Sequence, residues 1–218
     1  MIPAIPETAV AAAAADLAAA AAPPYLLNHS YRTFLFGRGL VPAGDVDDEA
    51  AFVASMLHDL GLTDEHQPEK EFAHSGAELA CAFLERHGWP LERIRLVEEA
   101  ILRHTNLLVE EVPVHRVVQA GAAVDVAGLG SEEMDPELLA RIVSAYPRLD
   151  FVEQMRTAFL DEARRHPEGA FAELERTVAL STRFAANPID RATGPSLTDL
   201  PSYATPGWAP DTGRQPHA

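Results

Sequence analysis

Apolar residues recur at helical spacing along most of this chain, and this periodicity constrains its fold more than any other feature. Helices are predicted where apolar spacing of three and four residues is bounded by capping and stop signals. One helix is expected between a cap at Asp47 or Asp48 and Gly61, and a strongly apolar one over residues 114–129. We find no convincing run in which apolar and polar residues alternate as in a half-buried strand. The sequence therefore predicts an all-α fold.

Proline, glycine and polar runs divide the chain into three predicted parts. An alanine-rich helix is expected within residues 1–24, capped by Thr8 and stopped by Pro23 and Pro24. Residues 25–186 carry the amphipathic and apolar segments of a single helical domain. Residues 187–218 are rich in Pro, Gly, Ser and Thr, so they are predicted to form an irregular tail.

Charge and composition exclude several classes of partner. The 218 residues include 17 basic and 33 acidic ones, which gives a net charge of −16. Nucleic acids and anionic membranes both require basic surface, so neither is an expected partner. The alanine block has no cationic flank, which argues against a signal peptide, and it is too short and too weakly apolar to span a bilayer. With a single cysteine, Cys81, the chain is expected to be cytoplasmic.

The basic residues also hint at the source of the chain. Only Lys70 is a lysine and the rest are arginines, and alanine and proline are abundant. This usage suggests a GC-rich bacterial genome. A homo-oligomeric state is left open.

Four polar residues interrupt or end apolar helical faces and form the candidate site. They are His29, the adjacent pair His58 and Asp59, and Asp125 within the apolar 114–129 segment. An isolated buried carboxylate is costly, so Asp125 needs a cation or several hydrogen-bond partners. One metal ion held by all four side chains would satisfy them together. The alternatives are a surface His29, a His58 favoured by the dipole at a helix end, and an Asp125 that caps a helix or pairs with an arginine.

Four segments in order carry a resemblance to a known family. They are Asn-His-Ser-x-Arg around His29, Leu-His-Asp-Leu-Gly-Leu-Thr at residues 57–63, the stretch 72–77, and Ala-Ile-Leu-Arg-His at residues 100–104. Over about residues 25–185 the chain resembles the HD-domain superfamily of metal-dependent hydrolases, and within it the cyanamide hydratase-like branch. The resemblance implies an all-helical fold and a divalent metal bound by His29, His58, Asp59 and Asp125.

The number of metals depends on two further histidines. Some HD proteins bind a second metal through two additional histidines, and His74 and His104 are the candidates here. His74, however, stands two residues before Gly76 rather than four, which turns it by about 200° around a helix from the required position. One metal is therefore favoured. Nitrogen and oxygen donors suit zinc, iron and manganese alike, with zinc or iron expected and manganese allowed.

The ligand set predicts metal-activated hydroxide that could attack a nitrile carbon or a phosphorus centre, and the resemblance implies hydration of a small-molecule substrate. A bound metal lowers the pKa of its water towards ~7 and so supplies hydroxide at neutral pH. Attack on a nitrile carbon would convert cyanamide to urea, the reaction of a hydro-lyase. His104 is the predicted proton donor, with His74 as the reserve. Arg32 either contacts an anionic substrate or pairs with an acid behind the metal ligands, and Thr63 is predicted to line the pocket.

Three other functions remain open at this point. An HD phosphohydrolase of a nucleotide or phosphate ester would need cations near the phosphate, and only Arg32 is a convincing candidate. A di-iron oxygenase would need both His74 and His104 as ligands. A non-catalytic, metal-stabilised binder is the least favoured, because the ligand set leaves room for water.

Overall fold

The computed structural model describes residues 1–42, 44, 46–63 and 69–192. Regular structure in these ranges is helical throughout, which confirms the predicted all-α class. In chain order the elements are α1 (Ala9–Ala21), α2 (Pro24–Leu40), α3 (Asp48–Leu57), the 3-10 turn η1 (Leu60–Leu62), α4 (Phe72–Arg86), α5 (Leu91–Arg103), α6 (Pro113–Ala127), the 3-10 turn η3 (Ser131–Glu133), α7 (Pro136–Ala145), α8 (Phe151–Arg165), α9 (Ala170–Val178), α10 (Leu180–Ala186) and α11 (Pro188–Ala192). None of the described helices combines the length and apolar character needed to span a bilayer.

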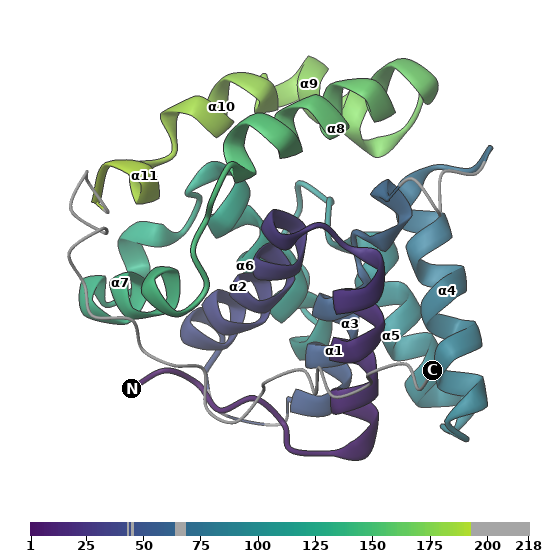
Figure 1. Ribbon diagram of the computed structural model, residues 1–218. Helices are drawn as coiled ribbons and strands as arrows, with labels where there is room; N and C mark the ends of the chain where they lie inside the picture. Colours follow the sequence, from purple (N-terminus) through teal and green to yellow (C-terminus); the bar gives the residue numbers. More distant parts are fainter. Residues whose placement is uncertain (43, 45, 64–68, 193–218) are drawn as a thin grey trace, which may run out of the picture.

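Helices α2 and α6 lie against each other at the centre of the molecule, with α1 and α3 beside them, and the α4–α5 pair flanks α3 (Figure 1). Glycine allows the close approach of α2 and α6. A Cβ atom at Gly121 would lie 1.8 Å from the carbonyl oxygen of Thr33, and one at Gly37 would lie 2.0 Å from the carbonyl oxygen of Val117. Only hydrogen fits at these two positions. The tight contact sets the relative position of the helices that carry His29 and Asp125.

Local capping explains where several of these helices begin and end. The Thr8 side chain accepts a hydrogen bond from the backbone of Ala11, and Asp47 does the same for Ala50. Both N-caps were expected from the sequence. Helix α6 ends at Gly128, whose φ of 72° is the left-handed conformation that favours glycine at a helix end.

The C-terminal helices α8, α9 and α10 form a cover over the inner helices (Figure 1). They contribute an aromatic cluster in which Phe159 lies between Phe171 and Phe184, with ring centroids 4.1 and 5.6 Å away. Phe72 of α4 stacks on Phe171 at 4.2 Å and so joins this cover to the inner helices. The cover thus has its own apolar cluster, which faces the end of the bundle where the candidate site lies.

Part of the predicted irregular tail is ordered. Asn187 is buried, and its side-chain oxygen accepts a hydrogen bond from the backbone of Ile189 at the start of α11. The expectation of irregular structure is therefore wrong for residues 188–192, because this cap and the burial of Ile189 stabilise a short helix. Residues 193–218 lie outside the described part of the chain. The division at residues 24 and 186 stays a prediction.

Candidate metal centre

Three of the predicted ligands meet at one buried point. His29 lies in the second turn of α2, His58 ends α3, and Asp59 follows it directly before η1. The Nε2 atoms of His29 and His58 are 3.2 Å apart. The Asp59 Oδ2 atom is 3.3 Å from each of them. In the described part of the chain these three residues form the group of donors that could hold a metal ion.

Hydrogen bonds at the far side of each ring determine which nitrogen faces this point. His29 Nδ1 is 2.6 Å from Oδ2 of Asp125, and His58 Nδ1 is 2.8 Å from the carbonyl oxygen of Ser55. Both partners accept hydrogen bonds, so the proton of a neutral ring is on Nδ1 and the lone pair is on Nε2. Two lone pairs then face each other and the Asp59 carboxylate. Such an arrangement calls for a cation between them.

The geometry and the electrostatics of the three residues fit a divalent metal. A tetrahedral site with bonds of 2.0–2.1 Å has donor–donor edges of about 3.3 Å, close to the separations seen here. The Asp59 Oδ1 atom is buried and has no hydrogen-bond partner. Burial acts to lower the pKa of His29, but the carboxylates of Asp125 and Asp59 outweigh it and raise this pKa. The site therefore favours positive charge.

His104 lies beside the three ligands at the end of α5. Its Nδ1 lies 2.6 Å from the carbonyl oxygen of Ile101, and its Nε2 is 3.6 Å from Oδ1 of Asp59. Burial, reinforced by the nearby His58, lowers the pKa of His104 to about 4. The ring is then neutral near pH 7, with its lone pair on Nε2. This geometry suits a proton acceptor or a further ligand, and it does not fit the predicted role of a protonated donor.

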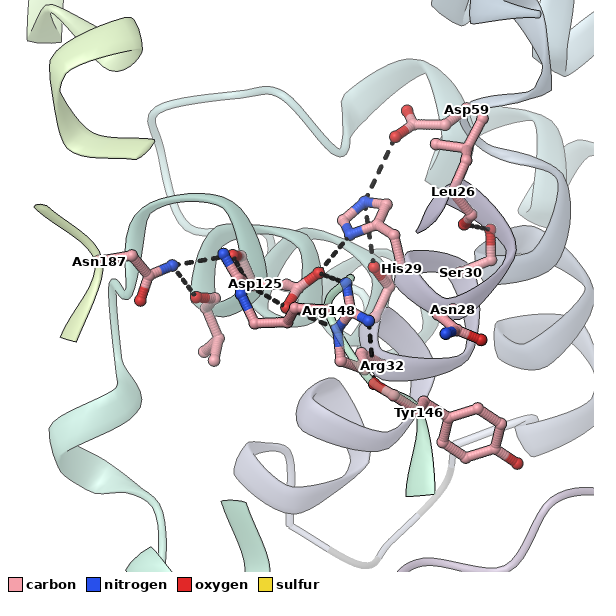
Figure 2. Close-up of polar contacts among 12 residues, drawn as sticks. Leu26, Asn28, His29, Ser30, Arg32, Asp59, Asp125, Tyr146, Arg148 and Asn187 are labelled. Carbon is pink, nitrogen blue, oxygen red and sulfur yellow. Dashed lines mark hydrogen bonds and ion pairs between the residues drawn. The ribbon is translucent and has the colours of Figure 1, made fainter. Parts of the chain in front are cut away.

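Asp125 lies behind His29 rather than at the meeting point of the other ligands (Figure 2). Its two oxygens accept hydrogen bonds of 2.8 and 2.7 Å from Arg32, and one of 2.6 Å from Arg148. Burial acts to raise the pKa of Asp125, but the charges of Arg32 and Arg148 hold it well below its ordinary range. The structure therefore shows the alternative of a carboxylate paired with arginine. In this arrangement Asp125 orients His29 and does not point at the metal position.

Arg32 is a partner of Asp125 and not a substrate contact. It is fully buried, and its Nη1 also donates to the carbonyl oxygens of Tyr146 and Pro147 at 3.0 and 3.1 Å. The prediction that Arg32 might bind an anionic substrate is wrong, because its donors are already engaged away from the cavity. The other predicted alternative, that Arg32 pairs with an acid behind the metal ligands, agrees with its contacts to Asp125.

Sequence reasoning missed Arg148. This residue follows α7 and joins Asp125 to Asp190 of α11, through a 2.7 Å hydrogen bond from its Nε to Oδ1 of Asp190. The amide of Asn187 donates to the Asp125 carbonyl oxygen at 2.8 Å, so α11 is attached to the same point (Figure 2). The signal available in the sequence was the cost of burying Asp125. Arg32 already donates to both carboxylate oxygens, so that cost did not by itself point to a second arginine.

His74 is not part of the site. Its side chain is largely exposed and lies 3.7 Å from a carboxylate oxygen of Glu71. Gly76 packs on the backbone of His58, where a Cβ atom would lie 2.8 Å from the carbonyl oxygen, so position 76 faces inward and position 74 faces outward. The predictions of His74 as reserve proton donor and as ligand of a second metal are therefore wrong. The di-iron alternative, which required both His74 and His104, loses one of its ligands.

Thr63 is buried close to the ligands, but it is not among the side chains that line the cavity. Its hydroxyl donates to the carbonyl oxygen of Leu60 at 2.8 Å and so closes the turn after Asp59. The prediction that Thr63 lines the pocket is not what the structure shows. Its visible contribution is to the conformation of the turn that carries Asp59.

A cavity of about 190 Å³ lies next to the ligands. His29, His58, Asp59 and His104 form its polar end. The remaining lining residues, most of them apolar, are Thr105, Asn106, Leu107, Gln119, Ala122, Ala123, Val126, Ala127, Leu129, Met155, Phe159, Phe171, Leu174, Val178, Leu180, Arg183 and Phe184. We call the part between α6 and the helices α8–α10 the apolar chamber. A molecule that reaches the ligands through this cavity therefore contacts mainly apolar side chains.

Two comparisons with known proteins agree with this geometry. The family model described as HD domain matches residues 26–151. The chain is also similar to two proteins of Saccharomyces cerevisiae, cyanamide hydratase DDI2 and cyanamide hydratase DDI3. It is 26% identical to each over 158 residues, which are 68% of this chain and 70% of the yeast protein. The resemblance expected from the four sequence segments is confirmed.

Proposed function

This chain belongs to the HD-domain family, and we propose that it is a hydratase that adds water to the carbon of a small neutral nitrile. Family and ligand cluster together indicate a metal-dependent hydrolase or hydratase. The finer assignment to nitrile hydration is supported by the similarity to the two yeast cyanamide hydratases. For cyanamide the product would be urea, and for other nitriles the corresponding amide.

The observation that carries the proposal is the absence of cationic groups beside the ligands, among the residues that line the cavity. Arg183 is the one basic lining residue, and it is exposed. Arg32 and Arg148 are close in space but are hydrogen-bonded to Asp125. Apart from the metal and its histidine ligands, a phosphate ester would find no second cation beside the ligands to share its negative charge, whereas a nitrile is uncharged. The site therefore favours the nitrile over the phosphohydrolase alternative.

The donors that would hold a single divalent metal are His29 Nε2, His58 Nε2 and the Asp59 carboxylate, with zinc, iron or manganese as candidates. When bound, such a metal supplies a water whose pKa is lowered to ~7 and a Lewis acid for the nitrile nitrogen. Asp125 and the Ser55 carbonyl keep the two imidazoles in the tautomer that offers Nε2. The carbonyl oxygen of Ile101 likewise keeps the proton of the His104 ring on Nδ1. The Nε2 atom of His104 is then able to accept a proton from the attacking water.

Amide formation from a panel of nitriles, measured beside hydrolysis of p-nitrophenyl phosphate, tests the proposal. The purified chain is loaded in turn with zinc, iron and manganese, and the metal content is determined for each preparation. We expect nitrile hydration that depends on about one metal per chain. Phosphate ester hydrolysis without nitrile hydration would overturn the proposal in favour of the phosphohydrolase.

A further inference from the structure

The cavity is much larger than cyanamide requires. Its volume is about 190 Å³. One water molecule occupies about 30 Å³ of the liquid, and an apolar protein cavity of about 150 Å³ is enough to hold benzene. Cyanamide has only three non-hydrogen atoms, so it would leave most of the space to water that contacts apolar walls.

The walls of the apolar chamber suit a compact apolar group. On one side α6 presents small side chains, among them Ala122 and Ala123. On the other side the cover presents the rings of Phe159, Phe171 and Phe184. An aryl or branched alkyl group fills a space between small residues and aromatic rings, and its contacts with the rings are more favourable than those of water.

The chamber side of the cavity is mainly apolar, and the amide of Gln119, one of its few polar lining groups, is already hydrogen-bonded to backbone groups of Asn106, Leu108 and Glu110. Histidine and aspartate side chains lie at one end, where the reaction is proposed to occur, and the apolar chamber extends from there. A molecule that fits both parts has one small polar head and one apolar body. The chamber walls from α8–α10 lie beyond residue 151, where the match to the HD domain family ends.

We infer that the substrate is a nitrile bearing an apolar body about the size of a benzene ring. The inference rests on the proposed function and specifies its substrate class. The nitrile carbon lies at the His29–His58–Asp59 end, and the body fills the apolar chamber. Cyanamide is then a poor substrate, because it makes few contacts with the chamber walls.

Steady-state kinetics with benzonitrile, acetonitrile and cyanamide test this inference on the metal-loaded chain. We expect kcat/KM for benzonitrile to exceed that for cyanamide by at least about tenfold, since even one methylene in an apolar pocket is worth about that factor. In Ala123→Leu, which fills part of the chamber, the ratio of the two kcat/KM values should fall by about tenfold. Val126→Phe is a second filling variant in case the first does not fold. Ala140→Leu, on the exposed face of α7, is the matched control and should keep the wild-type ratio.

Binding of toluene and benzamide gives a readout that does not depend on turnover. Both compounds should raise the melting temperature of the wild type and of Ala140→Leu, and should have a much smaller effect on Ala123→Leu. Rapid hydration of cyanamide with slow benzonitrile turnover and no toluene binding would overturn the inference and leave the hydratase proposal standing. If no nitrile is hydrated, the proposed function fails, and the substrate inference fails with it even if toluene binds.

Discussion

His29 is the residue on which the candidate metal centre depends most directly, because its ring lies between the carboxylates of Asp59 and Asp125 (Figure 2). A hydrogen bond between its Nδ1 atom and Asp125 orients the ring, so that its Nε2 atom points towards Asp59 and His58. The imidazole is therefore held in its ligand geometry by contacts that do not involve a metal. Such a preformed donor reduces the reorganisation that metal binding requires.

Replacing His58 by alanine is expected to abolish metal binding and turnover together. The variant loses one of three converging donors, and neither of the other two can move into its place. Metal content after dialysis and amide formation are the measurements. His74→Ala is the matched control, since this histidine is exposed and should retain wild-type metal content and activity. Full metal occupancy in His58→Ala would show that the ligand assignment is wrong.

Asp125→Asn is expected to lower the free energy of unfolding by about 3–5 kcal/mol, because Arg32 and Arg148 lose the charge that compensates them in a buried site. Urea denaturation measures the effect. Glu137→Gln removes the exposed partner of Arg141 and should leave stability nearly unchanged. Equal stability of the two variants would mean that the arginines are compensated by another group.

At the level of elements, the contact between α2 and α6 is the most sensitive part of the fold. Gly121→Ala places a methyl group against the backbone of Thr33, which cannot move without shifting a helix. We expect a loss of about 3 kcal/mol, towards the upper end of the usual range for overpacking. The measurement is the midpoint of chemical unfolding.

Gly39→Ala provides the control in α2, at a position that faces Met134 and α7 and not α6. Its new methyl group would meet only the ends of the Met134 and Leu138 side chains, which can move aside. Because alanine is the better helix former by up to ~1 kcal/mol, this variant should be as stable as the wild type or slightly more stable. Similar destabilisation by both variants would contradict the view that backbone contact at Gly121 limits the approach.

The helices could be predicted from sequence because their signals are local. Apolar spacing and caps such as Thr8 and Asp47 depend on residues within one or two turns of each other. The convergence of His29 with His58 and Asp59 also followed from polar residues that interrupt apolar faces. The two-residue distance of His74 from Gly76 argued against a ligand of a second metal, but it did not predict that the side chain is exposed.

Contacts between distant elements could not be predicted. Asp125 was expected at the metal, but its orientation depends on Arg148, whose position is set by the path of the chain after α7. The same holds for the apolar chamber, since Phe159 and Phe171 read only as helical core residues until α8 and α9 are placed over α6. The spacing of apolar residues within one helix carries no information on which distant helix will pack over that helix.

At the level of the whole molecule, the buried histidines predict a stability maximum near pH 6.5 for the metal-free protein. The pKa of His104 is lowered by burial from 6.5 to about 4, so the unfolded chain takes up a proton before the folded one and stability falls as the pH drops from 6.5 towards 4. The pKa of His29 is raised above 6.5, so its contribution is complete below 6.5 and is lost as the pH rises through its folded value.

Urea unfolding in the presence of a chelator, repeated between pH 4 and pH 8, measures this profile. In His104→Gln the free energy of unfolding should fall less between pH 6.5 and pH 4, because the glutamine does not titrate. His87→Gln, at an exposed position, should keep the wild-type profile. An unchanged acidic side in His104→Gln would show that other groups determine the acid limit. Below about pH 4 the carboxylates, Asp125 among them, add a further loss, since their depressed pKa values stabilise the fold only while they are ionised.

The reactive end and the aromatic wall of the chamber come from different stretches of this chain, and that division has an evolutionary consequence. The donors all precede residue 126, while the aromatic cover follows residue 151. With Phe151 kept in place, because its ring stacks on His29 at 4.9 Å, change in the last helices can reshape what the protein accepts without disturbing the donors. A library confined to α8–α10 would therefore be an efficient route to new specificities, with Arg148 and Asp190 left untouched as the link between the two halves.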